Sequence, residues 1–129
     1  MRPPPIICVD FDGTVVDHEY PGIGPLKSGV REALESFRHL GYKIIISSCR
    51  TCMWYPEVFN IYGDHLPIAR DRRVVKEMVA FLDANQIPYD EIDDGTKGKP
   101  VADFYIDDKA IRFDDNWPEI VHFVREKNT

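Results

Sequence analysis

The chain has 129 residues, 43% of them hydrophobic and 12% aromatic, which fits one globular domain over residues 1–129 and excludes a fibrous or disordered class. The formal net charge of −6, from 16 basic and 22 acidic residues, argues against a protein that coats nucleic acid. A bound divalent cation reverses the local sign, so an anionic small-molecule substrate remains compatible with this charge.

Three features favour a reducing, cytoplasmic location. No apolar run approaches the roughly 20 residues that a membrane-spanning helix needs. The first residues, Met-Arg-Pro-Pro-Pro, lack the apolar core of a secretory signal. The cysteines, Cys8, Cys49 and Cys52, cannot all pair within one chain and do not resemble a disulfide framework. We therefore expect a cytoplasmic protein that does not associate with a membrane.

The first half of the chain alternates between strand and helix patterns. Residues 6–9 form an unbroken apolar run, which suits a strand buried on both faces of a parallel sheet. Glycine and proline predict a loop over residues 17–27. A helix is expected from Ser28, as its N-cap, through Leu40, with a stop at Gly41. The β-branched run 42–46 predicts a second buried strand.

The second half continues this alternation after residues 51–69, whose aromatic residues and prolines give no clear assignment. Apolar spacing predicts a helix over 71–85, a short strand at 91–93, a loop at 94–100, a strand at 102–106 and a helix at 117–127. Strands that alternate with helices predict an α/β fold. We expect a doubly wound, Rossmann-type parallel sheet in a three-layer α/β/α arrangement, with helices on both faces.

Three of the predicted strands end in polar residues. These are Asp10-Phe11-Asp12, Ser47-Ser48 and Asp107-Asp108. In open α/β sheets, ligands bind beyond the carboxyl ends of the strands. The three groups should therefore meet at one edge of the sheet, which makes that edge the candidate site.

Each group also has a structural interpretation. Asp10 and Asp12 could be an acidic turn, although two carboxylates on one side of a strand repel unless a cation or a proton intervenes. Serine after a strand is common in turns, and taken alone Ser47-Ser48 favours that interpretation. Lys97 and Lys99 resemble solvated surface charges. Adjacent aspartates at a buried strand end, however, need compensation, and Mg²⁺ prefers such oxygen ligands.

Together, these segments resemble the signature motifs of the haloacid dehalogenase (HAD) superfamily. Asp10–Val16, an Asp-x-Asp-Gly-Thr sequence after an apolar strand, is similar to the first motif. Ile44–Ser48 resembles the second and Lys99-Pro100 the third. Tyr105–Asp108 resembles the fourth, in its two-aspartate form. The order is that of the family, and the motifs extend from residue 6 to residue 108.

The resemblance implies a magnesium-dependent phosphohydrolase, a hydrolase of phosphate monoesters that forms an aspartyl phosphate on Asp10. Asp12 would act as general acid and then as general base. Ser48, with Ser47 as the alternative, would hold the phosphoryl group, and Lys99 would offset negative charge. The metal ligands would be Asp10, the backbone carbonyl of Asp12, and Asp107 or Asp108. Further substrate contacts are expected from Phe11, Gly13, Ser47 and Arg50.

The segments between the motifs are too short for a large cap domain. We expect a nearly capless enzyme with an open site, although residues 51–69 have room for a small lid. Cys49 and Cys52 have a redox or half-zinc spacing, but no second pair completes a zinc site. We interpret them as incidental thiols. The physiological phosphorylated substrate and the formation of a homo-oligomer stay open.

Two other functions fit parts of this pattern. Response-regulator receivers also combine strand-end aspartates with a serine or threonine and a lysine, but they carry the phosphorylated aspartate after a middle strand. In this chain the middle strand ends in Ser47-Ser48 instead. The second alternative is a binding protein that keeps the fold without catalysis. Rapid turnover of the aspartyl phosphate would separate a phosphatase from a receiver.

Overall fold

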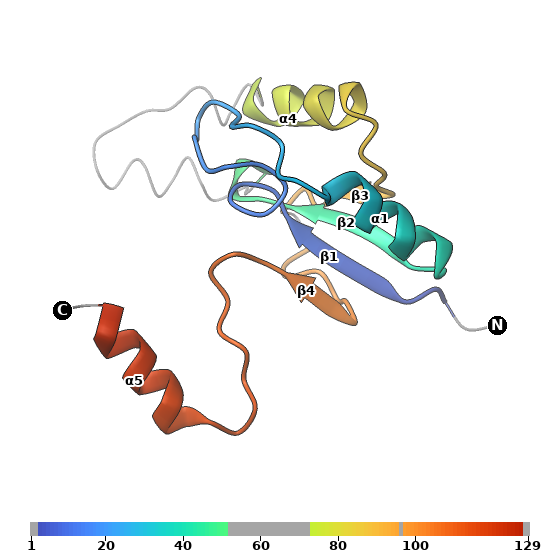
Figure 1. Cartoon of the computed structure of the whole chain (residues 1–129). Coiled ribbons are helices and arrows are strands. Elements are labelled where there is room, and N and C mark those ends of the chain that lie inside the picture. The colour runs from blue at the N-terminus through green and yellow to red at the C-terminus, as the bar shows by residue number, and fades with distance from the viewer. Residues whose placement is uncertain (1–2, 52–72, 96, 128–129) are drawn as a thin grey trace.

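The structure is a computed structural model, and it describes residues 3–51, 73–95 and 97–127. Figure 1 shows its strands and helices along the chain. The elements are β1 (Ile6–Asp10), α1 (Val30–His39), β2 (Lys43–Ser47), the 3₁₀ turn η1 (Cys49–Thr51), α4 (Arg73–Ala84), β3 (Glu91–Ile92), β4 (Phe104–Ile106) and α5 (Trp117–Lys127).

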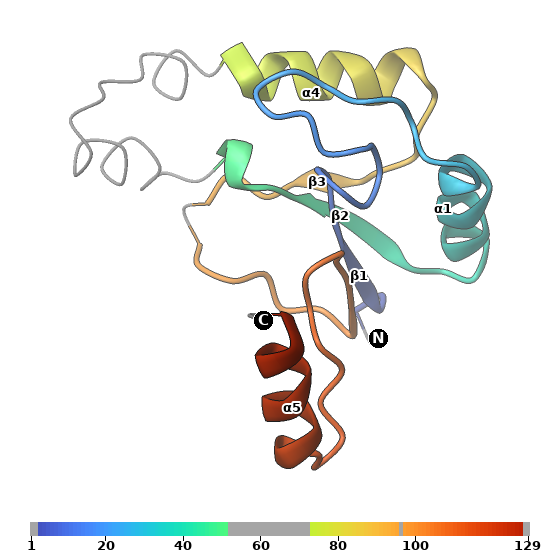
Figure 2. The same cartoon turned by 60° about the vertical axis from the view of Figure 1, so that its left-hand side comes forward.

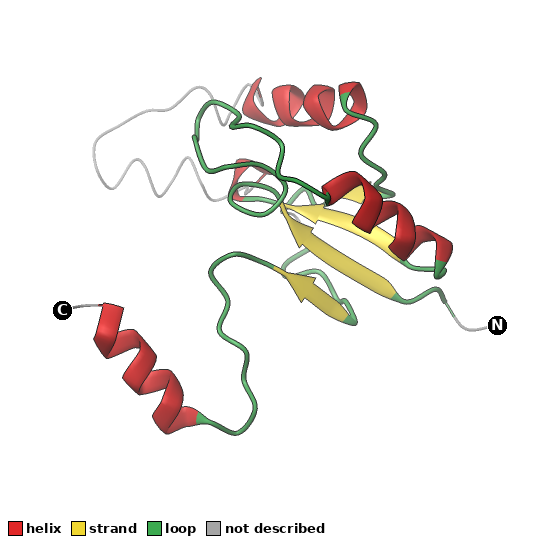
Figure 3. Cartoon of the chain, in the orientation of Figure 1, coloured by secondary structure: helices red, strands yellow, loops and turns green. Residues whose placement is uncertain are grey.

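The four strands form one parallel sheet in the order β3-β2-β1-β4 (Figure 3). β1 lies in the middle and pairs with β2 from Ile6↔Lys43 to Asp10↔Ser47. On its other side β1 pairs with β4, from Ile7↔Phe104 to Val9↔Ile106. The α/β class with a parallel sheet is therefore confirmed, and three of the four carboxyl strand ends are those that the sequence marks with polar residues.

Side chains of β1 and β2 alternate between the two faces of the sheet. Ile7, Val9, Ile44 and Ile46 belong to one buried cluster with Leu34 of α1 and with Met78 and Leu82 of α4. Both helices therefore pack on the same face. Most of the buried hydrophobic residues belong to this cluster, so this face holds most of the core. Truncating one of these side chains to alanine typically costs about 2–5 kcal/mol.

The strand order explains why α1 and α4 share a face. The connections β1-α1-β2 and β2-α4-β3 step in the same direction along the sheet, and right-handed crossovers then place both helices on the same side. Figure 2 shows α1 and α4 together on one side of the strands, away from α5. The connection from β3 back to β4 has to cross to the opposite face.

That opposite face carries no helix layer among the residues that the structure describes. The crossing segment, 93–103, is loop wherever it is described. α5 buries none of its residues, and its Trp117, Phe123 and Val124 are exposed. The described part of the chain thus shows one helix layer on the sheet, and the doubly wound three-layer arrangement stays a prediction.

Most of the predicted elements are confirmed, with shifts at their ends. α1 begins after Gly29, which is the N-cap at φ 84° with no side-chain hydrogen bond, so the expected capping by Ser28 is wrong. The expected stop at Gly41 holds, because φ at this residue is 93°. β4 is shorter than the predicted 102–106. Apart from Thr51 in η1, residues 51–69 and the suggested lid lie outside the described part of the chain.

The structure also bears on membrane association. Within residues 3–51, 73–95 and 97–127, no helix combines the length and the apolar character that crossing a bilayer requires. The longest described helix is α4, with 12 residues.

Candidate functional site

The site begins where β1 ends. Asp10 is the last residue of β1, and Phe11 continues the ladder by donating its backbone N–H to the Ser47 carbonyl at 3.1 Å. The Phe11 carbonyl then accepts from the amides of Val15 and Val16, at 2.9 and 3.3 Å. This tight turn anchors the Asp-x-Asp-Gly-Thr segment directly above the sheet edge.

The described residues line several cavities, among them one of about 350 Å³ and one of about 330 Å³ at the carboxyl ends of the strands. The second of these gathers most of the predicted site residues. That cavity of about 330 Å³ is called the acidic cavity below. Its lining comes from the β1 end, the loop after it, the β2 end and the β4 end: Asp10, Asp12, His18, Tyr20, Ser48, Cys49, Asp107, Asp108 and Lys109.

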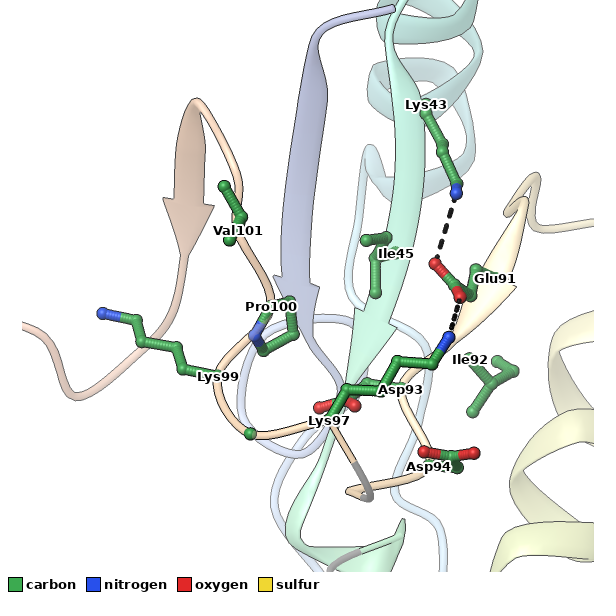
Figure 4. Close-up of a pocket in the computed structure, with 11 residues that line it drawn as sticks. Lys43, Ile45, Glu91, Ile92, Asp93, Asp94, Lys97, Lys99, Pro100 and Val101 are labelled. Carbon is green, nitrogen blue, oxygen red and sulfur yellow. Dashed lines mark ion pairs between the residues drawn. The ribbon is translucent and has the colours of Figure 1, made fainter. Parts of the chain in front are cut away.

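The cavity of about 350 Å³ lies on the helix-free side of β2 and β3 (Figure 4). Its charges largely compensate one another, because Glu91 pairs with Lys43 at 3.3 Å and with Lys97 at 3.6 Å. It contains no carboxylate cluster of the kind that binds a metal ion, since the one such cluster among the described residues lies elsewhere. We therefore take the acidic cavity as the candidate site.

Three carboxylates converge in the acidic cavity. One oxygen from each of Asp10, Asp107 and Asp108 lies within 4.8 Å of the others. Burial raises the pKa of Asp10 from 3.8 to about 7, and the charge of Asp107 and a hydrogen bond to Asp108 add to this rise. Such repulsion is relieved by a proton or by a cation, and oxygen donors at these spacings suit Mg²⁺.

Within this cluster the pKa shifts of two aspartates have opposite directions, raised for Asp10 and lowered for Asp108. The pKa of Asp108 is lowered, first by a hydrogen bond from Lys109, whose Nζ lies 3.1 Å from Oδ2. Lys109 also donates its backbone N–H to Asp107 Oδ1 at 2.7 Å. Lys109 thus supplies positive charge to the cluster, a role that the sequence interpretation assigned to another lysine.

Lys99, the expected counter-charge, is placed differently. Its Nζ lies over the ring of Tyr105, 4.4 Å from the centroid, and no ion pair joins it to Asp10 in the described structure. Figure 4 shows its side chain pointing away from Lys97 and Glu91. Lys99 does share a smaller cavity, of about 150 Å³, with Asp10 and Ser47. The Lys99 side chain therefore lies near the site, but among the described residues it forms no ion pair with Asp10.

The two serines lie in different cavities. Ser48 lines the acidic cavity together with Asp12, whereas Ser47 lines the smaller cavity together with Lys99. The Ser48 hydroxyl accepts a hydrogen bond from the backbone N–H of Arg50 at 3.0 Å, and its carbonyl accepts from Thr51. Ser48 therefore has both the turn-forming role and a place on the cavity wall.

Two residues expected to contact substrate are buried instead. Phe11 is fully buried and packs edge-on against Phe81, with ring centroids 6.1 Å apart. The Arg50 side chain has no exposed surface, and its Nε and Nη2 donate to the two oxygens of Asp12, each at 2.8 Å. Both residues support the site from within the protein.

Gly13 is required by both conformation and space. Its φ is 89°, a backbone conformation that residues with a Cβ rarely adopt. A Cβ at this position would also overlap the Asp108 carboxylate. The absence of a side chain at Gly13 is thus what allows the end of β4 to approach the end of β1.

The comparisons with known proteins report on the fold. No protein-family model matches. No curated protein matches either. A conserved protein from Bacteroides thetaiotaomicron superposes with a TM-score of 0.57 at 22% sequence identity, covering 96% of this chain and 92% of that one. A structural-genomics target from Vibrio cholerae is 31% identical over 97% of this chain and 99% of its own, with a TM-score of 0.46. At 22% identity, the first likeness supports the fold alone.

Gly13→Ala gives a test of this packing, with Gly41→Ala as the matched control. Both residues have positive φ, so both variants should lose about 1–2 kcal/mol in the free energy of unfolding. A Cβ at Gly41 meets nothing within 4 Å, whereas one at Gly13 displaces Asp108. We expect only Gly13→Ala to weaken Mg²⁺ binding, by about tenfold or more. Equal Mg²⁺ affinity in the two variants, measured by calorimetry, would contradict the close approach of Asp108.

The raised pKa of Asp10 predicts a pH dependence of stability in the absence of metal. The folded protein keeps a proton on Asp10 up to about pH 7, whereas the unfolded chain releases it near 3.8. The folded state therefore binds more protons in this window, and its free energy of unfolding should fall as the pH rises from about 4 to about 7. The lowered pKa of Asp108 acts below that window.

Urea unfolding in chelator, with wild type and Asp10→Asn side by side, isolates this contribution from that of other carboxylates. The variant should gain stability relative to wild type as the pH rises. A constant difference between the two proteins across the window would show that Asp10 titrates normally.

Proposed function

We propose that this protein is a magnesium-dependent phosphohydrolase of the HAD type, which hydrolyses phosphate monoesters through an aspartyl phosphate on Asp10. One observation carries the proposal: carboxylates from two neighbouring parallel strands, β1 and β4, converge in one cavity of about 330 Å³ together with Ser48. This is the edge where ligands bind in open α/β sheets.

The residues of the cavity supply what phosphoryl transfer requires. A carboxylate nucleophile splits hydrolysis into two displacements, and Asp10 is the carboxylate at the centre of the cluster. Phosphoryl transfer depends mainly on positioning and on charge stabilisation. Positive charge comes from Lys109, which is paired with Asp108 at 3.1 Å, and Lys99 lies beside the adjoining small cavity.

Asp12 is arranged to act on a water molecule. Its carboxylate has about four acceptor sites, of which two take the hydrogen bonds from Arg50. The others remain for a hydroxyl or a water in the cavity that Asp12 lines. In the proposed reaction Asp12 protonates the leaving group in the first step and receives the proton of the attacking water in the second. The Ser48 hydroxyl donates a hydrogen bond to an oxygen of the transferred phosphoryl group.

Mg²⁺ would be held by Asp10, by the Asp12 backbone carbonyl and by Asp107 or Asp108. The fit rests on the donor set, which is three carboxylates within 4.8 Å of one another, a spacing at which they cannot all stay charged without a cation or a proton. When bound, the ion neutralises charge on the phosphate and favours the ionised form of Asp10.

The proposal includes the doubly wound three-layer fold. The helix-free face of the sheet and the exposed apolar side chains of α5, which include Val121, Phe123 and Val124, are complementary surfaces for such a layer. The similar solved structure from Bacteroides thetaiotaomicron supports the α/β fold.

Release of inorganic phosphate from a panel of phosphate monoesters tests this function. Wild-type protein should release phosphate from at least one ester with Mg²⁺ and should lose that activity in chelator. Readdition of Mg²⁺ should restore it. Release that persists unchanged in chelator would contradict the proposed metal dependence, and no release from sugar, nucleoside and aryl phosphates would contradict the proposed reaction.

A further inference from the structure

Arg50 is the largest fully buried side chain of the described residues, and it lies next to the acidic cavity. It belongs to η1, the turn that directly follows β2, and its side chain has 0% exposed surface. A buried guanidinium is expensive unless its donors are paired. The groups with which it is paired therefore identify its role.

Two of those groups are the oxygens of Asp12. Arg50 Nε donates to Oδ2 and Nη2 donates to Oδ1, both at 2.8 Å, in the bidentate geometry that fixes a carboxylate in plane. The Asp12 side chain is itself only 13% exposed. This contact sets the orientation in which Asp12 meets the cavity.

The other two groups lie in the loop 17–25, which joins the Asp-x-Asp-Gly-Thr turn to the segment before α1. Arg50 Nη2 donates to the Gly22 carbonyl at 2.6 Å, and Nη1 donates to the Pro21 carbonyl at 3.2 Å. The guanidinium also lies 5.0 Å from the centroid of the Tyr20 ring. One side chain thus bonds to Asp12 and to the tip of this loop at the same time.

Two further contacts of the loop lie at its base. Asp17 donates its backbone N–H to the Pro25 carbonyl at 2.9 Å, and its side chain pairs with Lys27 at 3.1 Å. These contacts close the two ends of the loop. The tip, which carries His18 and Tyr20 along the cavity wall, is bonded to Arg50 through the carbonyls of Pro21 and Gly22.

We propose that Arg50 is a positioning residue that couples the substrate-facing loop 17–25 to Asp12, so that the wall formed by His18 and Tyr20 and the orientation of Asp12 are set together. This inference rests on the proposed phosphohydrolase function. Arg50 does not touch the substrate. It acts on substrate binding through the loop and on the rate of turnover through Asp12.

Lysine cannot replace Arg50 in this role, because a single ammonium cannot bond bidentately to a carboxylate and also reach two carbonyls. With p-nitrophenyl phosphate as the probe, Arg50→Lys should lower kcat and raise KM, each by about tenfold or more, since hydrogen bonds to a charged group are lost. Arg38→Lys is the matched control. Arg38 also bonds a carbonyl (Tyr89) and a carboxylate (Asp90), but at the amino-terminal edge of the sheet, and its variant should keep the wild-type constants.

A double-mutant cycle separates coupling from a general loss of stability. His18→Ala should raise KM in wild type, because His18 lines the cavity. In Arg50→Lys the loop is already released, so adding His18→Ala should change KM by less than about twofold. Additive effects of the two substitutions would overturn the proposal while leaving the phosphohydrolase function intact.

Hydrogen exchange tests the loop without reference to turnover. Backbone amides of residues 17–24 should exchange faster in Arg50→Lys than in wild type or Arg38→Lys, with β1 and β2 unchanged. If Arg50→Lys does not fold, Tyr20→Leu, which removes the ring beside the guanidinium, should accelerate the same amides to a smaller extent. Unchanged exchange in the loop would overturn the proposal. Faster exchange in a protein that hydrolyses no phosphate ester would overturn the function and keep the coupling.

Discussion

Replacing Asp10 with asparagine is expected to lower the rate of phosphate release by about 10,000-fold or more, because the proposed nucleophile is removed and such losses are typical of catalytic groups. Asparagine has the same shape as aspartate but is a poor nucleophile. It also carries no charge, so it adds no negative charge to the proposed Mg²⁺ site with Asp107 and Asp108.

The same substitution should leave the protein folded. The Asp10 carboxyl is half-buried beside two other carboxylates, and this burial raises its pKa to about 7. Removing an ionisable group from such a site relieves repulsion instead of creating it. Circular dichroism and the urea midpoint should therefore match or exceed the wild-type values at pH 7 or above.

Asp114→Asn is the matched control for this experiment. It changes the same functional group at an exposed position in the loop before α5. We expect wild-type phosphate release from this variant. Residual activity in Asp10→Asn within about tenfold of wild type would assign the nucleophile to another residue and contradict the proposed chemistry.

The second large effect is expected when one carboxylate of the Asp10, Asp107 and Asp108 cluster is removed, and it is a loss of Mg²⁺ affinity. Asp108→Asn should weaken Mg²⁺ affinity by about tenfold or more, because Mg²⁺ is bound through few carboxylates and each carries a full charge. Asp107→Asn should act in the same direction, and the larger loss of affinity identifies the direct ligand. Titration calorimetry with MgCl₂ gives both constants without any substrate.

Thermal unfolding gives an independent measure of the same site. A ligand at 100 times its dissociation constant stabilises the folded state by about 2.7 kcal/mol. Wild-type protein should show this rise in stability with Mg²⁺. Asp114→Asn should behave as wild type, and Asp108→Asn should need about tenfold more Mg²⁺ for the same rise. Equal stabilisation of all three proteins would place the metal elsewhere.

The position of the site could be predicted because it follows from backbone topology. A buried strand pattern fixes the direction of the chain, and parallel strands bring their carboxyl ends to one edge of the sheet. Asp10, Ser48 and the Asp107-Asp108 pair are the residues that follow these ends, and the structure brings them to one cavity. Gly13 fits the same logic, since the turn after β1 requires a positive φ.

Side-chain pairing could not be predicted in the same way. Arg50 follows Ser48 by two residues, which suggests a place on the cavity wall, yet its length and its five donors let it reach Asp12 and the loop tip from within the core. Lys109 follows the aspartate pair directly, and this adjacency was the available signal for its charge role. Lys99 lies in a loop whose path no local pattern fixes.

The layer arrangement was inferred from the alternation of strands and helices, which does not specify the face that each helix covers. The sheet order β3-β2-β1-β4 decides this, because both crossovers step in one direction. Sheet order depends on contacts between segments far apart in the sequence, as in the pairing of β1 with β4. Such contacts leave no periodic signature in either strand.

Peptide mass spectrometry after an acid quench tests whether Asp10 becomes phosphorylated during turnover. Wild-type protein mixed with Mg²⁺ and p-nitrophenyl phosphate should carry one phosphoryl group on the peptide that contains Asp10, sensitive to hydroxylamine, as an acyl phosphate is. The label should be absent in Asp10→Asn and should disappear when the substrate is exhausted. A label on a different residue, or phosphate release with no labelled peptide at any quench time, would contradict an aspartyl phosphate on Asp10.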